Sequence, residues 1–213
     1  MGSSTRFPIS VIIIAIAVSP APCQHAEPDC FYCNALVVKF PFALVTDAQR
    51  NATKAVELHL SRDEGVTWQH VQTVPADVKW ISFTAKSDGA FWFALRTIDK
   101  SGNRDPAVLD KSAIQMKVVF DTTPPVVELR AKPGRKDALG VTWKVSDDHL
   151  DGASVRLEYR QRDEATWTSV PIDIALRECT VPARPGTGVT VRLTARDLAG
   201  NATSKSVVFP ATP

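Results

Sequence analysis

Apolar residues alternate with polar ones along most of the chain after residue 33, with a period of two rather than 3.6. A period of two is typical of β-strands that bury one face, whereas amphipathic helices repeat apolar positions every three to four residues. The alternating positions of the first half are Phe40, Phe42 and Leu44; Val56, Leu58 and Leu60; Ile81 and Phe83; Phe91, Phe93 and Leu95; and Ile114, Met116, Val118 and Phe120. Turn-forming clusters with Gly, Asp and Asn separate these runs. The pattern predicts an all-β chain without a convincing amphipathic helix.

The same pattern occurs a second time. Its apolar positions there are Val141, Trp143 and Val145; Val155, Leu157 and Tyr159; Cys179 and Val181; Val189, Val191 and Leu193; and Val207 and Phe209. A local match is closer still, because Asp99-Lys100-Ser101-Gly102-Asn103 is answered by Asp197-Leu198-Ala199-Gly200-Asn201. A repeated unit of about 90 residues with some seven short strands predicts two tandem immunoglobulin-like β-sandwiches.

The stretch Asp121-Thr122-Thr123-Pro124-Pro125 lies between the two copies. Adjacent prolines fix φ twice and donate no backbone hydrogen bond, so no central strand passes through them. We therefore expect an N-terminal tail at residues 24–33, a first sandwich at 34–121, a stiff joint, and a second sandwich at 122–213.

The first 23 residues have the pattern of a signal peptide. Arg6 precedes a ten-residue apolar run at residues 9–18, which is too short to span a bilayer. Cleavage after Cys23 would begin the mature chain at Gln24, and retention as a signal-anchor is the alternative. We expect a secreted, periplasmic or cell-surface protein that has no membrane segment after cleavage.

The charge is nearly balanced. Without residues 1–23, whose only charged side chain is Arg6, 24 basic and 23 acidic residues remain, interspersed along the chain. No block of one sign favours nucleic acid or an anionic membrane as a partner. The expected partner is an unidentified protein or glycan at the cell surface.

Cys30-Phe-Tyr-Cys33 has the spacing of a redox or half-zinc motif. The chain offers no second such pair for a zinc site, and no mixed helix-and-sheet pattern surrounds it. We expect these cysteines to form a local disulfide or to remain thiols in the tail. Cys179 is expected in a core strand as a small apolar residue.

The second copy resembles a fibronectin type III domain. The resemblance rests on Val141-Thr142-Trp143-Lys144-Val145, on Val155-Arg156-Leu157-Glu158-Tyr159-Arg160, and on the strand that begins at Val189. It implies a core Trp143 and a core Tyr159, and it departs at Val189, where a tyrosine is expected. The first copy departs further, with Leu44 in place of the tryptophan. The joint and the Asp-x-x-Gly-Asn turns are similar to tandem repeats of large bacterial secreted proteins.

Ser61-Arg62-Asp63-Glu64-Gly65-Val66-Thr67-Trp68 matches the sialidase Asp-box at every fixed position. In such a hairpin the Asp carboxylate accepts backbone N–H bonds, the Gly takes a positive φ and the Trp packs beneath. In sialidases the motif resembles a structural element set away from the active site. The alternative is a carbohydrate-active, sialidase-like enzyme or its accessory module. The second copy retains an eroded form, Asp163-Glu164-Ala165-Thr166-Trp167.

The sequence shows no catalytic motif and calls for no cofactor, so we expect a protein that is not an enzyme. Calcium at the acidic loop of residues 147–152 is an alternative to a simple capped turn there. Asn51 and Asn201 begin glycosylation sequons, which matter only on a glycosylating secretory route.

Four residues form the candidate contact face: Glu57, His59, Trp92 and Arg96. If Leu58 and Phe93 face the core, these four point outward from neighbouring strands. A Trp beside Arg and His is the composition of a contact patch, and a Trp face can stack on a sugar. Alternatively, Trp92 is covered by the N-terminal tail or by the second domain. The sequence thus predicts a non-catalytic binding or adhesion module, with a structural spacer as another alternative.

Overall fold

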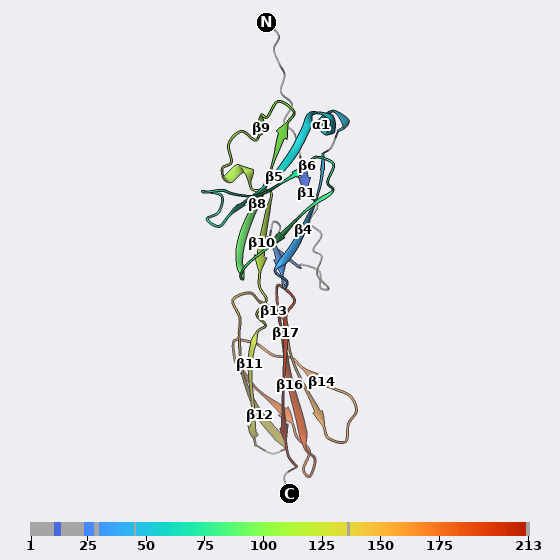
Figure 1. Ribbon diagram of the computed structural model, residues 1–213. Coiled ribbons are helices and arrows are strands. Elements are labelled where there is room, and N and C mark those ends of the chain that lie inside the picture. The colour runs from blue at the N-terminus through green and yellow to red at the C-terminus, as the bar shows by residue number, and fades with distance from the viewer. Residues whose placement is uncertain (1–10, 14–23, 28–29, 45, 136, 212–213) are drawn as a thin grey trace. The chain divides into compact units, whose positions relative to one another are not determined.

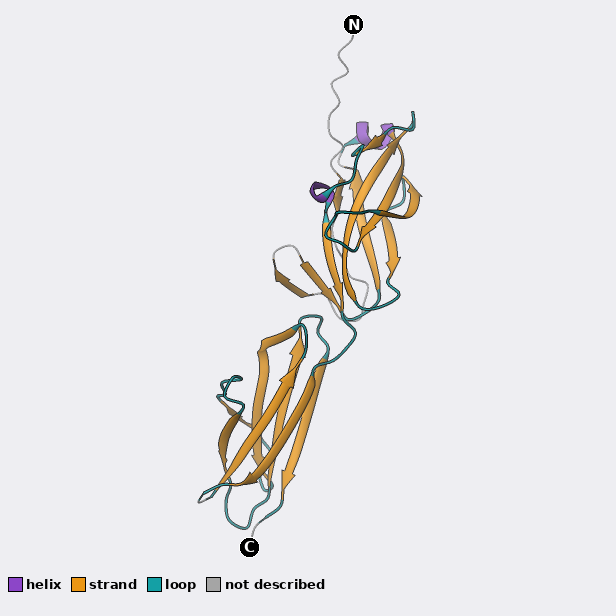
Figure 2. Ribbon diagram, turned by 90° about the vertical axis from the view of Figure 1, so that its left-hand side faces the viewer, coloured by secondary structure: helices purple, strands orange, loops and turns teal. Residues whose placement is uncertain are grey.

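The computed structural model describes residues 11–13, 24–27, 30–44, 46–135 and 137–211. The chain forms two compact units, Met1–Thr122 and Thr123–Pro213 (Figure 1). Strands make up most of each unit, and the described residues add only a short α-helix and a 3-10 turn (Figure 2). The predicted all-β fold of two tandem immunoglobulin-like, fibronectin type III-like sandwiches is confirmed.

Unit 1 packs two sheets against each other. One sheet has the order β1-β4-β7, formed by Val11–Ile13, Val37–Leu44 and Trp80–Thr84. The other has the order β2-β3-β10-β8-β5-β6, formed by Gln24–Glu27, Cys30–Cys33, Met116–Phe120, Gly89–Asp99, Thr53–Ser61 and Gln69–Pro75. The short β9 (Arg104–Asp105) adds to β8.

Unit 2 is also built from two sheets. The first has the order β11-β12-β15, formed by Val126–Pro133, Ala138–Ser146 and Glu178–Pro182. The second has the order β14-β13-β16-β17, formed by Thr168–Val170, Leu150–Gln161, Val189–Asp197 and Ala202–Phe209. The two units share one pairing. In unit 1, β5 pairs with β8, and in unit 2, β13 pairs with β16. Both β8 and β16 end at the aspartate of an Asp-x-x-Gly-Asn turn.

The alternating apolar residues form the two cores. In unit 1 the rings of Phe40 and Phe93 lie 4.7 Å apart between centroids, and neither side chain is exposed. In unit 2, Leu157 and Leu193 are fully buried and Trp143 is 5% exposed. Tyr159 is partly buried and packs against this second core. The period-two pattern therefore marks the faces that meet between the sheets.

A short helix, α1 (Asp47–Ala52), interrupts the strand pattern. Thr46 and Gln49 form a reciprocal capping box at its start, which satisfies backbone N–H groups that a helix end leaves free. None of its residues is buried, so the helix has no apolar stripe. The sequence therefore shows no helical periodicity there that could have predicted it. The 3-10 turn η1 (Lys111–Ala113) likewise precedes β10, which begins at Met116 rather than at Ile114.

Residues 30–33 lie in the sheet of unit 1, whereas the sequence predicted a tail. Strand β3 pairs in parallel with β10, with Cys30 opposite Lys117 and Cys33 opposite Phe120. Neither alternative for the pair, a local disulfide or two thiols, holds, because Cys33 is disulfide-bonded and Cys30 is not its partner. In an extended strand, residues three apart are separated by about 10 Å. A disulfide requires Cα atoms roughly 4.4–6.8 Å apart.

Most of the predicted signal peptide, residues 1–23, lies outside the described residues. Its described part, β1, pairs antiparallel with β4, with Val11 opposite Leu44. Cleavage of the segment stays a prediction. Within the described part of the chain, no helix has the length and apolar character needed to cross a bilayer.

Candidate functional site

The candidate site is centred on Glu57 in the middle of β5. Its neighbours Val56 and Leu58 are fully buried in the core, so alternation turns Glu57 toward the outer face of the sheet. The pairing of β5 with β8 places Arg96 directly opposite Glu57. These two side chains therefore share the outer face of neighbouring strands.

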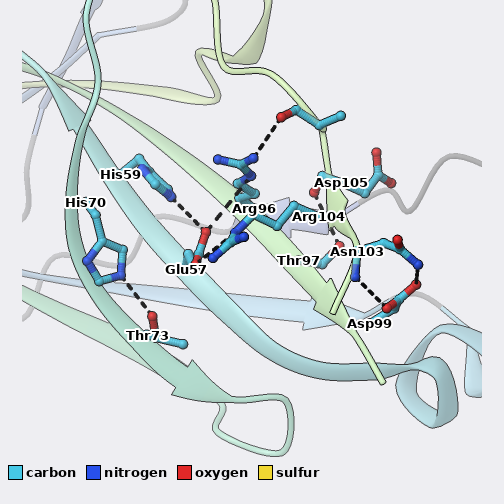
Figure 3. A network of polar contacts seen from close by, with 11 residues as sticks. Glu57, His59, His70, Thr73, Arg96, Thr97, Asp99, Asn103, Arg104 and Asp105 are labelled. Atoms are coloured by element: carbon cyan, nitrogen blue, oxygen red, sulfur yellow. Dashed lines mark hydrogen bonds and ion pairs between the residues drawn. The ribbon is translucent and has the colours of Figure 1, made fainter. Parts of the chain in front are cut away.

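Three nitrogen-bearing side chains surround the Glu57 carboxylate (Figure 3). His59 Nε2 lies 3.1 Å from Oε2 and donates a hydrogen bond to it. Arg104 Nε lies 3.4 Å from Oε1. Arg96 Nε lies 4.0 Å from Oε2, which is an ion-pair distance without a hydrogen bond. A single carboxylate is thus held between two guanidinium groups and an imidazole.

A polar pocket of about 390 Å³ opens over this cluster. Its lining residues are Glu57, His59, His70, Thr73, Arg96 and Arg104. Within the polar pocket the rings of His59 and His70 meet edge to face, with centroids 5.4 Å apart. His70 Nε2 also lies 2.8 Å from Thr73 Oγ1. Every lining side chain carries a group that can exchange hydrogen bonds with a ligand.

The loop after β8 folds back over the cluster. Strand β9 pairs with β8, with Arg104 opposite Ile98. Arg96 Nη2 donates a 2.7 Å hydrogen bond to the carbonyl oxygen of Ala107, which holds the continuing loop. As a result, Glu57 and His59 are only 5% and 7% exposed although they point away from the core.

The ionisation of the pair follows from this environment. Burial acts to raise the pKa of Glu57, but the hydrogen bond from His59 and the charge of Arg104 outweigh it, so the pKa is lowered. Burial also lowers the pKa of His59, and the opposing influence of Glu57 does not restore it. At neutral pH the pair is therefore a carboxylate beside a neutral imidazole.

Arg96 retains one unused donor. Its Nε is buried, and no hydrogen-bond partner for it exists among the described residues. A buried N–H without a partner costs free energy, and an oxygen supplied by a ligand would remove that cost.

The structure divides the predicted contact face in two. Glu57, His59 and Arg96 come together as expected, but all three are largely covered rather than exposed. Trp92 is opposite Ser61, four residues along β8 from Arg96, and lines a different hollow. The four residues are on one outer face without forming one patch.

Sequence reasoning missed three members of the polar pocket: His70, Thr73 and Arg104. The β5–β6 hairpin brings in the first two, with His59 opposite His70 and Glu57 opposite Thr73. A hairpin register could have found them. Arg104 follows the turn at Asp99, and only the course of the loop shows that it returns to Glu57.

The hairpin of residues 61–68 is tied together by its own side chains. Asp63 accepts hydrogen bonds from the backbone N–H and the hydroxyl of Thr67, at 2.8 and 2.6 Å. Ser61 accepts the N–H of Gly65, whose φ is +82°, and Trp68 Nε1 donates to the carbonyl oxygen of Gly65. These side chains bond to one another within the hairpin, so they stabilise the turn itself.

The two Asp-x-x-Gly-Asn turns have the same construction. The carboxylate of Asp99 accepts hydrogen bonds from the backbone and side-chain nitrogens of Asn103, each at 2.8 Å. Asp197 accepts the equivalent pair from Asn201, at 2.8 and 2.7 Å. In the acidic loop considered for calcium, Asp147 Oδ1 accepts the backbone N–H of His149 at 2.7 Å, as in a capped turn.

No protein-family model and no curated protein sequence matches this chain. Among solved structures it is similar to the fibronectin(III)-like modules of Clostridium thermocellum CbhA, at 15% identity, with a TM-score of 0.42 and coverage of 95% of this chain and 94% of that one. It is also similar to a two-domain fibronectin type III segment of chicken tenascin, at 11% identity, a TM-score of 0.39 and coverage of 96% and 99%.

A third similar structure contains the FN1–FN3 domains of chicken CNTN1, at 10% identity and a TM-score of 0.38. The match covers 92% of this chain but 65% of that chain. All three similarities concern the fold.

Proposed function

We propose that this protein is a secreted or cell-envelope binding module without catalytic activity, and that the polar pocket of unit 1 takes an anionic group of its ligand. The observation that carries the proposal is the convergence of Arg96 and Arg104 on a hollow with a single carboxylate, Glu57. The two guanidinium groups and the Glu57 carboxylate together carry one net positive charge.

Two features of the polar pocket favour an oxygen-bearing anion. Arg104 is half exposed at the rim, so its guanidinium can reach a ligand while it stays near Glu57. Arg96 brings the buried Nε that lacks a partner among the described residues. Guanidinium groups bind carboxylates and sulfates through paired, charge-assisted hydrogen bonds.

The same pocket argues against glycoside hydrolysis. That reaction ordinarily needs two carboxyl groups, one of them protonated to act as a general acid. Glu57 is the only carboxylate among the lining residues, and its lowered pKa keeps it ionised. Sialidases depart from this scheme by using a tyrosine nucleophile, and no tyrosine is among the lining residues of the polar pocket.

The test is calorimetric titration of the purified protein with sialylated and sulfated oligosaccharides, beside their neutral counterparts. We expect anionic members alone to bind, with affinity that falls as salt rises. Arg104→Gln should weaken that binding roughly tenfold or more, since a hydrogen bond between charged groups contributes about 1.5–3 kcal/mol. Arg130→Gln, at an exposed arginine of unit 2, is the matched control and should bind as the wild type does.

Two results would contradict the proposal. Turnover of any of these glycosides by the purified protein would favour the enzyme. Absence of binding across the panel, together with failure to retain any cell-surface protein, would favour a structural spacer.

A further inference from the structure

A second hollow lies on the outer face of the same sheet, and it contains Trp92. The register across three strands places Cys30 of β3, Lys117 of β10 and Trp92 of β8 side by side. Met116 and Val118 are buried in the core, so the alternation turns Lys117 outward with its two neighbours. These residues form the floor of the hollow, which we name the Trp92 groove.

The rim of the Trp92 groove comes from two loops. Lys111 and Ile114 belong to the segment around η1, and Glu64 belongs to the hairpin of residues 61–68. The hairpin is packed tightly against this segment. A Cβ at Gly65 would lie 3.0 Å from Ile114 Cδ1 and 3.1 Å from Lys111 Cα. The hairpin therefore sets the position of the rim, and Glu64 sits beside it with a fixed φ of +59°.

The groove has a volume of about 360 Å³, within the usual range for a small-ligand site. Its lining includes the aromatic ring of Trp92, the ammonium groups of Lys111 and Lys117, and the carboxylate of Glu64. The aromatic face suits an apolar ring surface, the ammonium groups suit a negative group, and the carboxylate accepts hydroxyl hydrogens.

We infer that the Trp92 groove binds a sugar ring that carries a carboxylate, such as a uronic acid residue. The C–H face of the ring stacks on Trp92, and its carboxylate meets Lys111 and Lys117. Its hydroxyl groups donate to Glu64. This site is separate from the polar pocket, because the two hollows share no lining residue.

The sheet topology favours a sugar over an acidic peptide. A peptide that adds to a sheet needs a free strand edge. Strand β10 is paired with β3 and β8, and β8 is paired with β10 and β5, so the floor of the groove has no free edge. Recognition there must come from side chains alone, and a glutamate-rich peptide offers no ring surface to stack on Trp92.

The test is titration of the purified protein with trigalacturonate and, separately, with its methyl ester. Calorimetry and tryptophan fluorescence measure the binding. The ester keeps the rings and hydroxyl groups but removes the negative charges. We expect the acid to bind and to change the fluorescence, and the ester to bind at least roughly tenfold more weakly. Equal affinity for the two ligands, or no binding of the acid, would overturn the inference.

Variants locate the binding. Lys111→Gln and Lys117→Gln keep the fold and should each weaken trigalacturonate binding severalfold. Trp92→Ala should abolish the fluorescence change. Trp80→Ala is the matched control, because Trp80 is 54% exposed, lies 5.8 Å from Lys39 Nζ and belongs to the opposite sheet of the same unit. An equal loss in Trp80→Ala would contradict the assignment.

The outcomes separate this site from the polar pocket. If Arg104→Gln weakens trigalacturonate binding while Lys111→Gln does not, the ligand occupies the polar pocket and the inference about the Trp92 groove is wrong. If the lysine variants weaken it and Arg104→Gln does not, the groove is the site. A glutamate-rich hexapeptide that binds more tightly than trigalacturonate, with the same dependence on Lys111, would overturn the assignment to a sugar.

Discussion

The carboxylate of Glu57 and the imidazole of His59, two residues apart on β5, are joined by a 3.1 Å hydrogen bond at a place where both side chains are less than a tenth exposed. Adjacent same-face residues of a strand are normally solvated when they point away from the core. Here the loop that contains β9 covers them, so the pair forms a buried polar cluster on the outer face of the sheet.

Replacing His59 should change how stability depends on pH. Because the folded-state pKa of His59 is lowered, the unfolded chain takes up a proton that the folded chain resists. Stability is therefore complete above the unfolded pKa of about 6.5 and falls as the pH decreases below it. His59→Gln should flatten this fall, as measured by urea midpoints between about pH 7 and pH 5.

Glu57 and His70 are the titratable groups that act on His59 in this pH range. Glu57 titrates at more acidic pH, because its own pKa is lowered. His70 lies edge to face with His59 and helps to lower the pKa of His59, so His70→Gln should flatten the fall in part. Identical slopes for wild type and His59→Gln would contradict the prediction.

Asp63 should contribute to stability in acid. The hydroxyl and backbone N–H of Thr67 and the hydroxyl of Ser61 lower the pKa of Asp63 to about 2. A carboxyl group with a depressed folded pKa stabilises the fold above its unfolded pKa of about 3.9, and that contribution is lost as the pH falls toward 2. Asp63→Asn should reduce the loss of stability across this window. Asp77→Asn, at an exposed carboxylate outside the hairpin, should not.

Loss of the asparagine side chain should cost more stability in one Asp-x-x-Gly-Asn turn than in the other. Asp197 is fully buried, whereas Asp99 is partly exposed and can turn to water. Asn201→Ala removes a hydrogen bond from the buried carboxylate and should lower the free energy of unfolding by about 1–3 kcal/mol. Asn103→Ala should have a smaller effect. Denaturation of both variants tests this order, and a larger loss for Asn103→Ala would contradict it.

Truncating an aromatic side chain in the core of unit 1 should cost much more stability than truncating an exposed one. Phe93 is fully buried, and its ring centroid lies 4.7 Å from that of Phe40 and 5.0 Å from that of Phe83. Phe93→Ala should lower the free energy of unfolding by about 3–5 kcal/mol, through lost burial and an unfilled cavity. Trp80→Ala should stay within about 0.5 kcal/mol of the wild type, because Trp80 is exposed. Similar costs for the two variants would refute this account.

The strand pattern and the turns were determined by the sequence itself. Alternation at Phe91, Phe93 and Leu95 is a local property, since successive side chains of a strand point to opposite faces. The carboxylates of Asp99 and Asp197 hold their turns locally, by accepting hydrogen bonds from residues two to four positions away. Each turn is also anchored from a distance, because Lys100 and Leu198 donate to the backbone carbonyls of Ala52 and His149. The alternation and the carboxylate contacts need no knowledge of distant segments, and they were predicted correctly.

Only the tertiary structure decided what covers each outer face. Arg104 reaches Glu57 across 47 positions of sequence, and its loop turns a predicted exposed face into a buried charged cluster. Cys30 reaches Lys117 through the pairing of β3 with β10, which turned a predicted tail into the floor of the Trp92 groove. Periodicity reports which side of a strand is apolar, but burial of the other side depends on contacts between segments far apart in the chain. Those contacts leave no repeat in the sequence, and so the split between the polar pocket and the Trp92 groove became visible only in three dimensions.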